Sequence, residues 1–155
     1  MLARPPASDD DTRRRMVRQR RRDTEPEQIV RRVIHALGHR FRLGNRDLPG
    51  SPDIANRSRK WGVFVHGCFW HQHEGCPRAT LPKRNRAWWK QKFRDNRRRD
   101  AKKLAALEAE GYLVVTVWEC ETEDTRALGK RLARALATLR RRPLRPPGRA
   151  RRSPT

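Results

Sequence analysis

The stretch "KWGVFVHGCFWHQHEGC" (residues 60–76) joins a short apolar run to a segment rich in cysteine, histidine and aromatic residues. The apolar run has the length and the β-branched residues of a buried strand. The segment that follows it holds soft metal ligands, titratable imidazoles and large rings within a few positions. An ordinary core strand or surface loop does not need that mixture. We therefore expect the functional centre of the protein to be built on this stretch.

The rest of the chain places further helices and strands around this strand. Thr24 is a good N-cap for a helix that Gly38 ends, and the apolar residues between them repeat at helical spacing. The predicted elements are a helix over 23–38, short strands at 40–44 and 52–56, the strand 60–67, a long basic helix over 86–111, the most apolar strand at 112–120, and a closing helix over 125–140. This order predicts an α/β (α+β) domain with a central mixed sheet flanked by helices. We expect that domain to span residues 23–140, with a basic arm over 1–22 and a Pro/Arg-rich basic tail over 141–155.

The charge of the chain is strongly positive. It contains 39 Lys+Arg against 17 Asp+Glu, a net charge of +22, and such a field attracts polyanions such as nucleic acids. A GC-rich genome would explain arginine in place of lysine, but not the scarcity of acidic residues. No apolar run reaches the roughly 18 residues of a membrane span, and no signal peptide is recognisable. We expect a monomeric protein of the bacterial cytoplasm, associated with the nucleoid and not with a membrane.

Three cysteines and one histidine have the spacing of a zinc site. Cys68, His73 and Cys76 form a C-x4-H-x2-C pattern, and Cys120 ends the last predicted strand. Three thiolates and one imidazole make a closed tetrahedral Zn²⁺ site, which stabilises a fold and leaves no position open for chemistry. The alternative is that Cys120 is a small buried apolar residue. Because the zinc interpretation uses every cysteine of the chain, it is the one we favour.

A second group of residues suggests hydrolytic chemistry. Asp53 follows a proline at the start of a predicted strand, and His66 and His71 remain once zinc has taken His73. A carboxylate and histidines near a strand end can bind Mg²⁺ and activate water against a phosphodiester. Pro-Asp also opens many turns, and a single histidine often only packs. Glu27 belongs to a Thr24-x-x-Glu27 capping box, a role compatible with a second one beside a metal ion.

Four motifs together resemble one family of DNA repair enzymes. "LPGSPDI" (48–54), "VFVHGCFWHQHEGC" (63–76), "NRRRD" (96–100) and "VWEC" (117–120) are similar, in order and spacing, to those of the very-short-patch repair (Vsr) endonucleases. The resemblance implies a restriction-endonuclease-like, PD-(D/E)XK-type fold with a structural zinc site. It also implies Mg²⁺-dependent nicking of DNA on the 5′ side of the mispaired T in a T:G mismatch. The wider superfamily places a Glu-x-Lys pair after its aspartate, and this chain has none there.

The resemblance also implies roles for individual residues. Asp53 matches the metal-binding aspartate, and Val65 the residue that ligates Mg²⁺ through its backbone carbonyl. His66 and His71 match the catalytic histidines, with His71 the general base, and Glu27 matches a glutamate near the catalytic centre. The structural Zn²⁺ ligands of the family match the four residues named above: Cys68, His73, Cys76 and Cys120. An imidazole titrates near neutral pH and therefore suits the proton transfer.

Aromatic residues near the zinc ligands would read the mismatch. The residues matching Phe69, Trp70 and Trp89 intercalate beside the mismatch in the family, and we expect Trp88 to lie in the core. An aromatic side chain inserts between base pairs more easily at a mispaired step, because that step resists unstacking less. Double-stranded DNA is the expected partner, and a MutL-type repair protein is a further candidate. Two alternatives stay open: a zinc-stabilised DNA-binding module without catalysis, and a related nuclease of different specificity.

Overall fold

A mixed sheet of three strands forms the centre of the protein, in a computed structural model that describes residues 3, 14 and 23–141. The strands are β1 (Ile54–Asn56), β2 (Trp61–His66) and β3 (Leu113–Trp118). Their order in the sheet is β1-β2-β3. β1 runs antiparallel to β2 with Ile54 opposite Val63, and β2 runs parallel to β3 with His66 opposite Trp118. The predicted mixed sheet is confirmed, and the parallel pair brings the ends of β2 and β3 to one edge.

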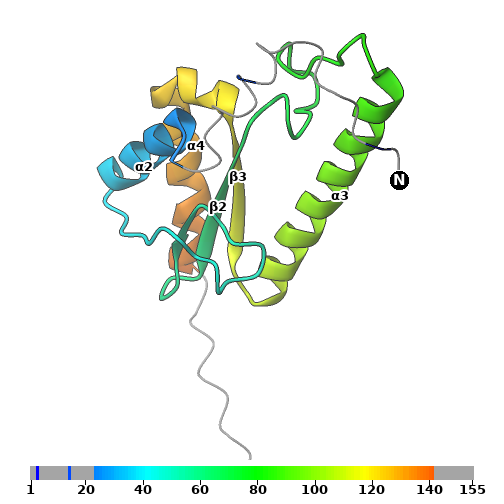
Figure 1. Cartoon of the computed structure of the whole chain (residues 1–155). Coiled ribbons are helices and arrows are strands. Elements are labelled where there is room, and N and C mark those ends of the chain that lie inside the picture. The colour runs from blue at the N-terminus through cyan, green and yellow to red at the C-terminus, as the bar shows by residue number, and fades with distance from the viewer. Residues whose placement is uncertain (1–2, 4–13, 15–22, 142–155) are drawn as a thin grey trace, which may run out of the picture.

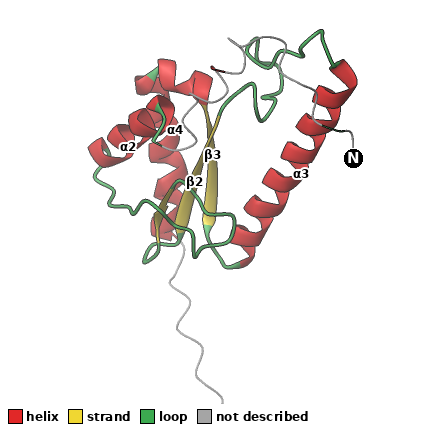
Figure 2. Cartoon of the chain, viewed as in Figure 1, coloured by secondary structure: helices red, strands yellow, loops and turns green. Residues whose placement is uncertain are grey.

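Helices cover both faces of this sheet. The described part of the chain contains the helices α2 (Glu25–Ala36), α3 (Arg86–Ala109) and α4 (Thr125–Ala137) and the 3-10 turns η1 (Glu119–Glu123) and η2 (Thr138–Arg141). Figure 1 shows α2 and α4 together on one side of β2 and β3, and α3 alone on the other side. Figure 2 shows that long loops connect these elements, above all between β2 and α3. None of the helices in the described residues is long and apolar enough to cross a bilayer.

Two apolar cores follow from the alternation of side chains along the strands. Val63 and its neighbours on one face pack against α2 and α4, and Phe64 and its neighbours on the other face pack against α3. The first core consists of Val30, Ile34, Ile54, Trp61, Val63, Val115, Val117, Leu128, Leu132 and Leu136, and the second of Leu48, Ala55, Phe64, Leu107 and Tyr112. Burial of this apolar surface, worth roughly 25 cal/mol per Å², holds the three layers together.

The first turn of α2 has the predicted cap at Thr24, except that Glu27 accepts from the amide of the residue before Thr24 and not from that of Thr24 itself. The Thr24 side chain accepts a hydrogen bond from the Glu27 backbone N–H at 3.4 Å, and Glu27 Oε2 accepts one from the Asp23 N–H at 2.9 Å. These bonds satisfy amide groups that a helix N-terminus leaves without partners. The predicted N-cap is confirmed.

Some predicted elements differ from the structure. Residues 40–44 form no strand. Arg42 makes a single antiparallel bridge to Ala55, and the Arg42 N–H and the Ala55 carbonyl are joined at 2.8 Å. A bridge forms because β1 is only three residues long and offers too short an edge for a longer ladder. The predicted arm over 1–22, apart from residues 3 and 14, and the tail beyond residue 141 lie outside the described residues.

Candidate active site and metal centre

The end of β2 and the loop that follows it carry two groups of potential metal ligands. Residues Cys68, His73 and Cys76 contribute, with Cys120, to what we call the Cys/His cluster. His66 of β2 and His71 of the loop contribute, with Asp100 of α3, to the His/Asp cluster. In each cluster the potential ligand atoms lie within 4.8 Å of one another. Ligands of the two clusters are interleaved along this segment of the sequence.

The Cys/His cluster has the donors and the spacing of a structural zinc site. His73 Nδ1 lies 3.7 Å from Cys68 Sγ and 3.4 Å from Cys120 Sγ. Those separations match neighbouring ligands on a tetrahedral metal with metal–ligand bonds of roughly 2.0–2.3 Å. Cys120 reaches the cluster because η1 begins directly after β3, beside the end of β2. All four residues predicted for zinc are therefore brought together.

Neighbouring charges and amides support the Cys/His cluster from outside. The Cys68 N–H donates to Glu119 Oε2 at 3.2 Å, and Arg78 lies 3.8 Å from Glu119 Oε1. Burial raises the pKa of Cys68 to about 12, whereas the backbone N–H of Arg78 lowers the pKa of Cys76. A bound divalent cation favours the thiolate form of such cysteines. The donor set therefore fits zinc, and the residues around it hold the loop in place.

The His/Asp cluster joins the end of β2, the loop and α3. The rings of His66 and His71 stack in parallel, with centroids 4.0 Å apart, and His71 Nδ1 lies 2.5 Å from Asp100 Oδ2. A carboxylate on Nδ1 fixes the tautomer of an imidazole and leaves Nε2 free to accept a proton. Burial lowers the pKa of His66 to about 4, so His66 is neutral at pH 7.

Asp100 was not singled out from the sequence as a site residue. Burial is the largest single influence and raises its pKa, but the hydrogen bond with His71 together with the charges of His71, His66 and Lys103 outweighs burial and holds the pKa of Asp100 below its ordinary value. Asp100 is therefore ionised at neutral pH. The sequence did contain a clue to Asp100, because it is the last residue of the motif "NRRRD". The first residue of the motif, Asn96, also contacts the loop: its Nδ2 donates to the Trp70 carbonyl at 2.9 Å. One face of α3 thus holds both the backbone and the imidazole of the loop.

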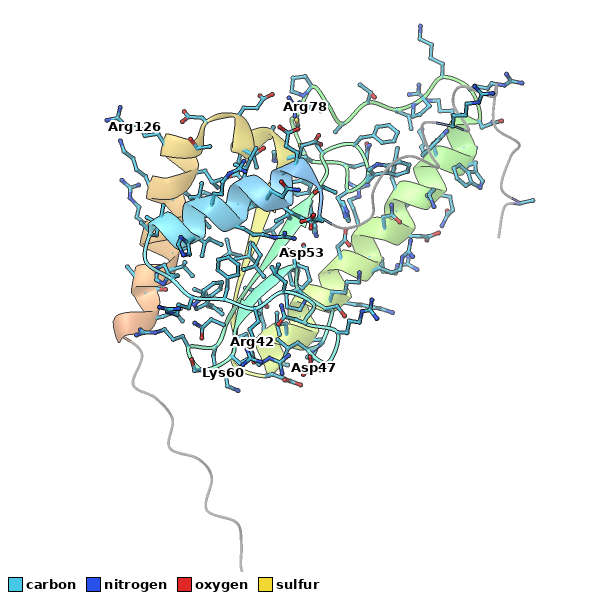
Figure 3. All side chains as sticks on the ribbon, turned by 60° about the vertical axis from the view of Figure 1, so that its left-hand side comes forward. Arg42, Asp47, Asp53, Lys60, Arg78 and Arg126 are labelled. Carbon is cyan, nitrogen blue, oxygen red and sulfur yellow. The ribbon has the colours of Figure 1, made fainter. Side chains whose placement is uncertain are left out.

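Asp53 lies next to the His/Asp cluster rather than in it. Its Oδ2 accepts a hydrogen bond from the Val65 N–H at 2.7 Å, so the carboxylate borders the residue that precedes His66. Burial, with a smaller contribution from the negative charge of Glu27, raises the pKa of Asp53 to about 6 although the hydrogen bond from Val65 lowers it. Figure 3 shows Asp53 at the centre of the molecule, between α2 and α3 in that view. A buried carboxylate with a raised pKa beside the end of a strand fits a site for a hard cation such as Mg²⁺.

Glu27 is close enough to Asp53 to act on it through charge, but its oxygens are already engaged. Oε1 accepts from the Thr24 hydroxyl at 3.2 Å, and Oε2 accepts from the Asp23 N–H at 2.9 Å and from Arg31 Nη2 at 3.2 Å. The structure thus supports the capping role directly. Glu27 is therefore near Asp53, but its oxygens are not free to bind a metal ion there.

The aromatic residues predicted to meet DNA lie together at the N-terminal end of α3. The ring centroid of Phe69 lies 5.1 Å from that of Trp70 and 5.6 Å from that of Trp89. Phe93, which is buried, lies beneath them at 5.3 Å from Phe69. We call Phe69, Trp70, Trp88, Trp89 and Phe93 the aromatic cluster.

Trp88 corrects one prediction. It belongs to neither apolar core. Its ring packs edge-on against Trp89 at 5.0 Å, with Lys92 Nζ 5.4 Å from the ring centroid. The reason is visible in Figure 1, where the N-terminal end of α3 extends away from the sheet. Trp88 therefore adds to the half-buried aromatic surface and not to the core.

Comparison with known proteins identifies the family. The family model described as "DNA mismatch endonuclease Vsr" matches residues 7–78. The type II nicking enzyme V.XorIIP of Xanthomonas oryzae pv. oryzae is 50% identical over 117 residues, which cover 76% of this chain and 85% of the relative. The type II nicking enzyme V.NmeAIP of Neisseria meningitidis is 36% identical over 119 residues, covering 77% and 84%. The DNA mismatch endonuclease Vsr of Escherichia coli is 34% identical over 99 residues, covering 64% and 63%. The chain therefore belongs to the Vsr DNA mismatch endonuclease family and is a DNA endonuclease.

Proposed function

We propose that this enzyme nicks one strand of duplex DNA on the 5′ side of the mispaired T in a T:G mismatch, by Mg²⁺-dependent hydrolysis. The observation that supports this most strongly is the position of His71. Its ring pairs with Asp100 at 2.5 Å, and it directly follows Trp70, whose ring belongs to the aromatic cluster. A base for hydrolysis and a wedge for the duplex are thus neighbours on one loop.

Hydrolysis would use His71 as the general base. Asp100 holds the Nδ1 side of the imidazole, so Nε2 accepts the proton of the attacking water, and the Asp100 carboxylate stabilises the imidazolium that forms. His66 stays neutral at pH 7 because burial lowers its pKa to about 4. Its ring therefore offers a lone pair to water and adds no second positive charge beside His71.

The metal ions have separate places in this proposal. Asp53 and the Val65 carbonyl would hold Mg²⁺, which supplies positive charge for the phosphate and the leaving oxygen. Glu27 would act on that site only through its charge, because its oxygens serve the helix cap and Arg31. Cys68, His73, Cys76 and Cys120 would hold a structural Zn²⁺. The fold proposed with this function is the restriction-endonuclease-like one, of which the three-stranded mixed sheet is the part described above.

Mismatch recognition would depend on the aromatic cluster. Phe69, Trp70 and Trp89 would enter the mispaired step from a loop that the Cys/His cluster holds rigid. Unstacking a base step costs roughly a few kcal/mol, and a mispaired step resists it less. The basic residues of α3 would neutralise backbone phosphates, so binding should weaken steeply as salt rises.

A nicking enzyme of different sequence context is a second candidate. It is favoured by the names of the relatives from Xanthomonas and Neisseria, which are type II nicking enzymes. The chemistry would be the same, and only the bases flanking the cut would differ.

A nicking assay tests these proposals. Labelled duplexes with a T:G mismatch in several flanking sequences, and matched T:A duplexes, are incubated with protein and Mg²⁺. We expect nicks 5′ to the mispaired T only. Asp53→Ala should lower the rate about 10²–10³-fold, a loss typical of removing one group that stabilises transition-state charge. Asp47→Ala is the matched control, because Asp47 is exposed and pairs with Arg57 at 2.5 Å, away from the site; it should cut like the wild type.

The other outcomes decide between this proposal and its alternatives. Binding of the duplex without nicking would indicate a DNA-binding module. Equal cutting of T:G and T:A duplexes would indicate a nuclease that does not read the mismatch. Mismatch cutting in one flanking sequence alone would assign the enzyme to that sequence context.

A further inference from the structure

One face of α3 contacts the loops and the sheet along most of its length. Residues three or four positions apart share a helix face, and the residues of this face make contacts already described. They are Trp89 and Phe93 in the aromatic cluster, Asn96 on the Trp70 carbonyl, Asp100 on His71, and Leu107 in the second core. Lys103 falls between Asp100 and Leu107 in this series, and it follows Asp100 by three residues. The helix therefore directs Lys103 toward the same side as Asp100.

The loop that leads to Asp53 packs directly on the backbone of Lys103. A Cβ atom added to Gly50 would lie 2.8 Å from Lys103 Cβ and 3.1 Å from Lys103 Cα. Contacts that short are not tolerated, so only a glycine at position 50 allows this approach, and its φ of +74° also favours glycine. Gly50 is three residues before Asp53 in the sequence "LPGSPD". Lys103 is thus held at the junction between α3 and the loop that carries the buried carboxylate.

Lys103 lies near enough to the site for its positive charge to lower the pKa of Asp53, of His66 and of Asp100. Arg31 also lowers the pKa of Asp53. Lys103 is exposed, and no carboxylate of the described residues forms an ion pair with it. Its ammonium is therefore available to an anion that enters the site.

We propose that Lys103 is a catalytic residue that contacts a non-bridging oxygen of the scissile phosphate. The proposal rests on the proposed function, because it needs a phosphodiester placed between Asp53 and His71. The O–P bond from water forms, the P–O bond to the leaving oxygen breaks, and the water proton goes to His71. Lys103 keeps its proton and stabilises the negative charge that grows on the phosphate oxygens.

The test separates the rate of cutting from the affinity for DNA. Single-turnover nicking of the T:G duplex with Mg²⁺, and the Kd of the same duplex in Ca²⁺, are measured for the full chain and three variants. Lys103→Ala should lower the rate constant about 10²-fold, as removal of one transition-state donor does, and should change Kd less than about threefold. Lys103→Arg should recover part of the rate because it keeps the charge. Lys102→Ala is the matched control for the rate constant, since Lys102 is also exposed but points about 100° away around the helix; any part it takes in neutralising phosphates changes Kd and not the rate constant.

The outcomes distinguish this proposal from the proposed function. If Lys103→Ala and Lys102→Ala cut at the same rate, or if Lys103→Ala changes Kd alone, Lys103 is only a phosphate-binding surface lysine and the inference is wrong. If the wild type does not nick the duplex at all, the proposed function itself is wrong. Thermal unfolding of each variant checks folding, and Lys103→Met, which keeps the aliphatic stem, replaces Lys103→Ala if that variant unfolds.

Discussion

The Cys/His cluster and the His/Asp cluster share a loop but differ in how the fold completes them. The Cys/His cluster takes three of its four ligands from the loop and the fourth from the turn after β3, so a parallel pair of strands is enough to assemble it. The His/Asp cluster needs Asp100 from α3, which lies on the opposite side of the sheet from α2 and α4. One cluster therefore depends on strand register and the other on helix docking. A single loop can serve both because soft and hard ligands are interleaved along it.

Trp118 lies between the two clusters. Its ring stacks on His73 with centroids 4.2 Å apart and an interplanar angle of 7°, and it meets the edge of His66 at 5.4 Å. His66 in turn stacks on His71. A continuous series of ring contacts thus runs from His73 of the Cys/His cluster to His71, so a disturbance in one cluster should be detectable in the other.

Removal of one zinc-binding thiolate should have the largest effect on stability and should show which of the two clusters stabilises the fold. Structural zinc contributes roughly 10–16 kcal/mol of binding free energy in small domains, so we expect Cys120→Ser to lose several kcal/mol of stability together with its zinc. Metal analysis and urea unfolding measure both. Wild-type protein treated with a chelator is the control and should behave like the variant. Full zinc content with unchanged unfolding would show that the Cys/His cluster does not brace the loop.

Asp100→Asn should impair the His/Asp cluster, and with it the nicking rate, without unfolding the protein. An asparagine can present its amide N–H to His71 Nδ1, which favours the tautomer with the proton on Nε2, so the nicking rate should fall about 10²–10³-fold. Zinc content should stay unchanged. The matched control is Asp95→Asn, because Asp95 is on the same helix and accepts from Gln91 Nε2 at 3.0 Å instead. Equal rates for the two variants would refute the pairing of His71 with Asp100 as part of catalysis.

The metal-free protein should be stabilised by Asp53→Asn at pH 7. The pKa of Asp53 is about 6 in the folded protein against an ordinary value of 3.8, so the folded state binds more protons than the unfolded state between these values. The contribution of Asp53 to stability therefore falls as pH rises through that window, reaching a penalty of at most about 3 kcal/mol above it. Asparagine cannot ionise and still accepts the Val65 N–H. Urea unfolding of both proteins from pH 4 to 7 measures the difference, and a difference that does not grow with pH would contradict the burial of this carboxylate.

Trp118→Leu should have the smallest effect and should test the link between the clusters. Each aromatic pair contributes roughly 1 kcal/mol beyond its burial, so the nicking rate should fall about five- to tenfold and zinc affinity should also fall. Trp118→Phe keeps a ring and should recover most of both losses. If Trp118→Leu lowers zinc affinity but leaves the rate unchanged, the two clusters act independently.

Local patterns in the sequence were enough for much of the fold and for one complete cluster. The cap at Thr24, the strand 61–66 and the helix over 86–109 follow from residue types and periodicity, because short-range interactions determine them. The four residues of the Cys/His cluster follow from the chemistry of cysteine and histidine, since few other arrangements would use every cysteine. The strand predicted over residues 40–44 was wrong, because strand pairing depends on the length of the neighbouring strand edge. The local sequence of residues 40–44 carries no information about that length.

The chain by itself therefore determined which residues can bind metal, stack on bases or neutralise phosphates. Only the tertiary structure decided that Asp100 meets His71, that Trp88 leaves the core and that Lys103 lies against Gly50. Each of these depends on where α3 lies relative to the loop after β2. That placement arises from the packing of Leu107 and Phe64 and from the close contact at Gly50, and these are contacts between segments far apart in the sequence.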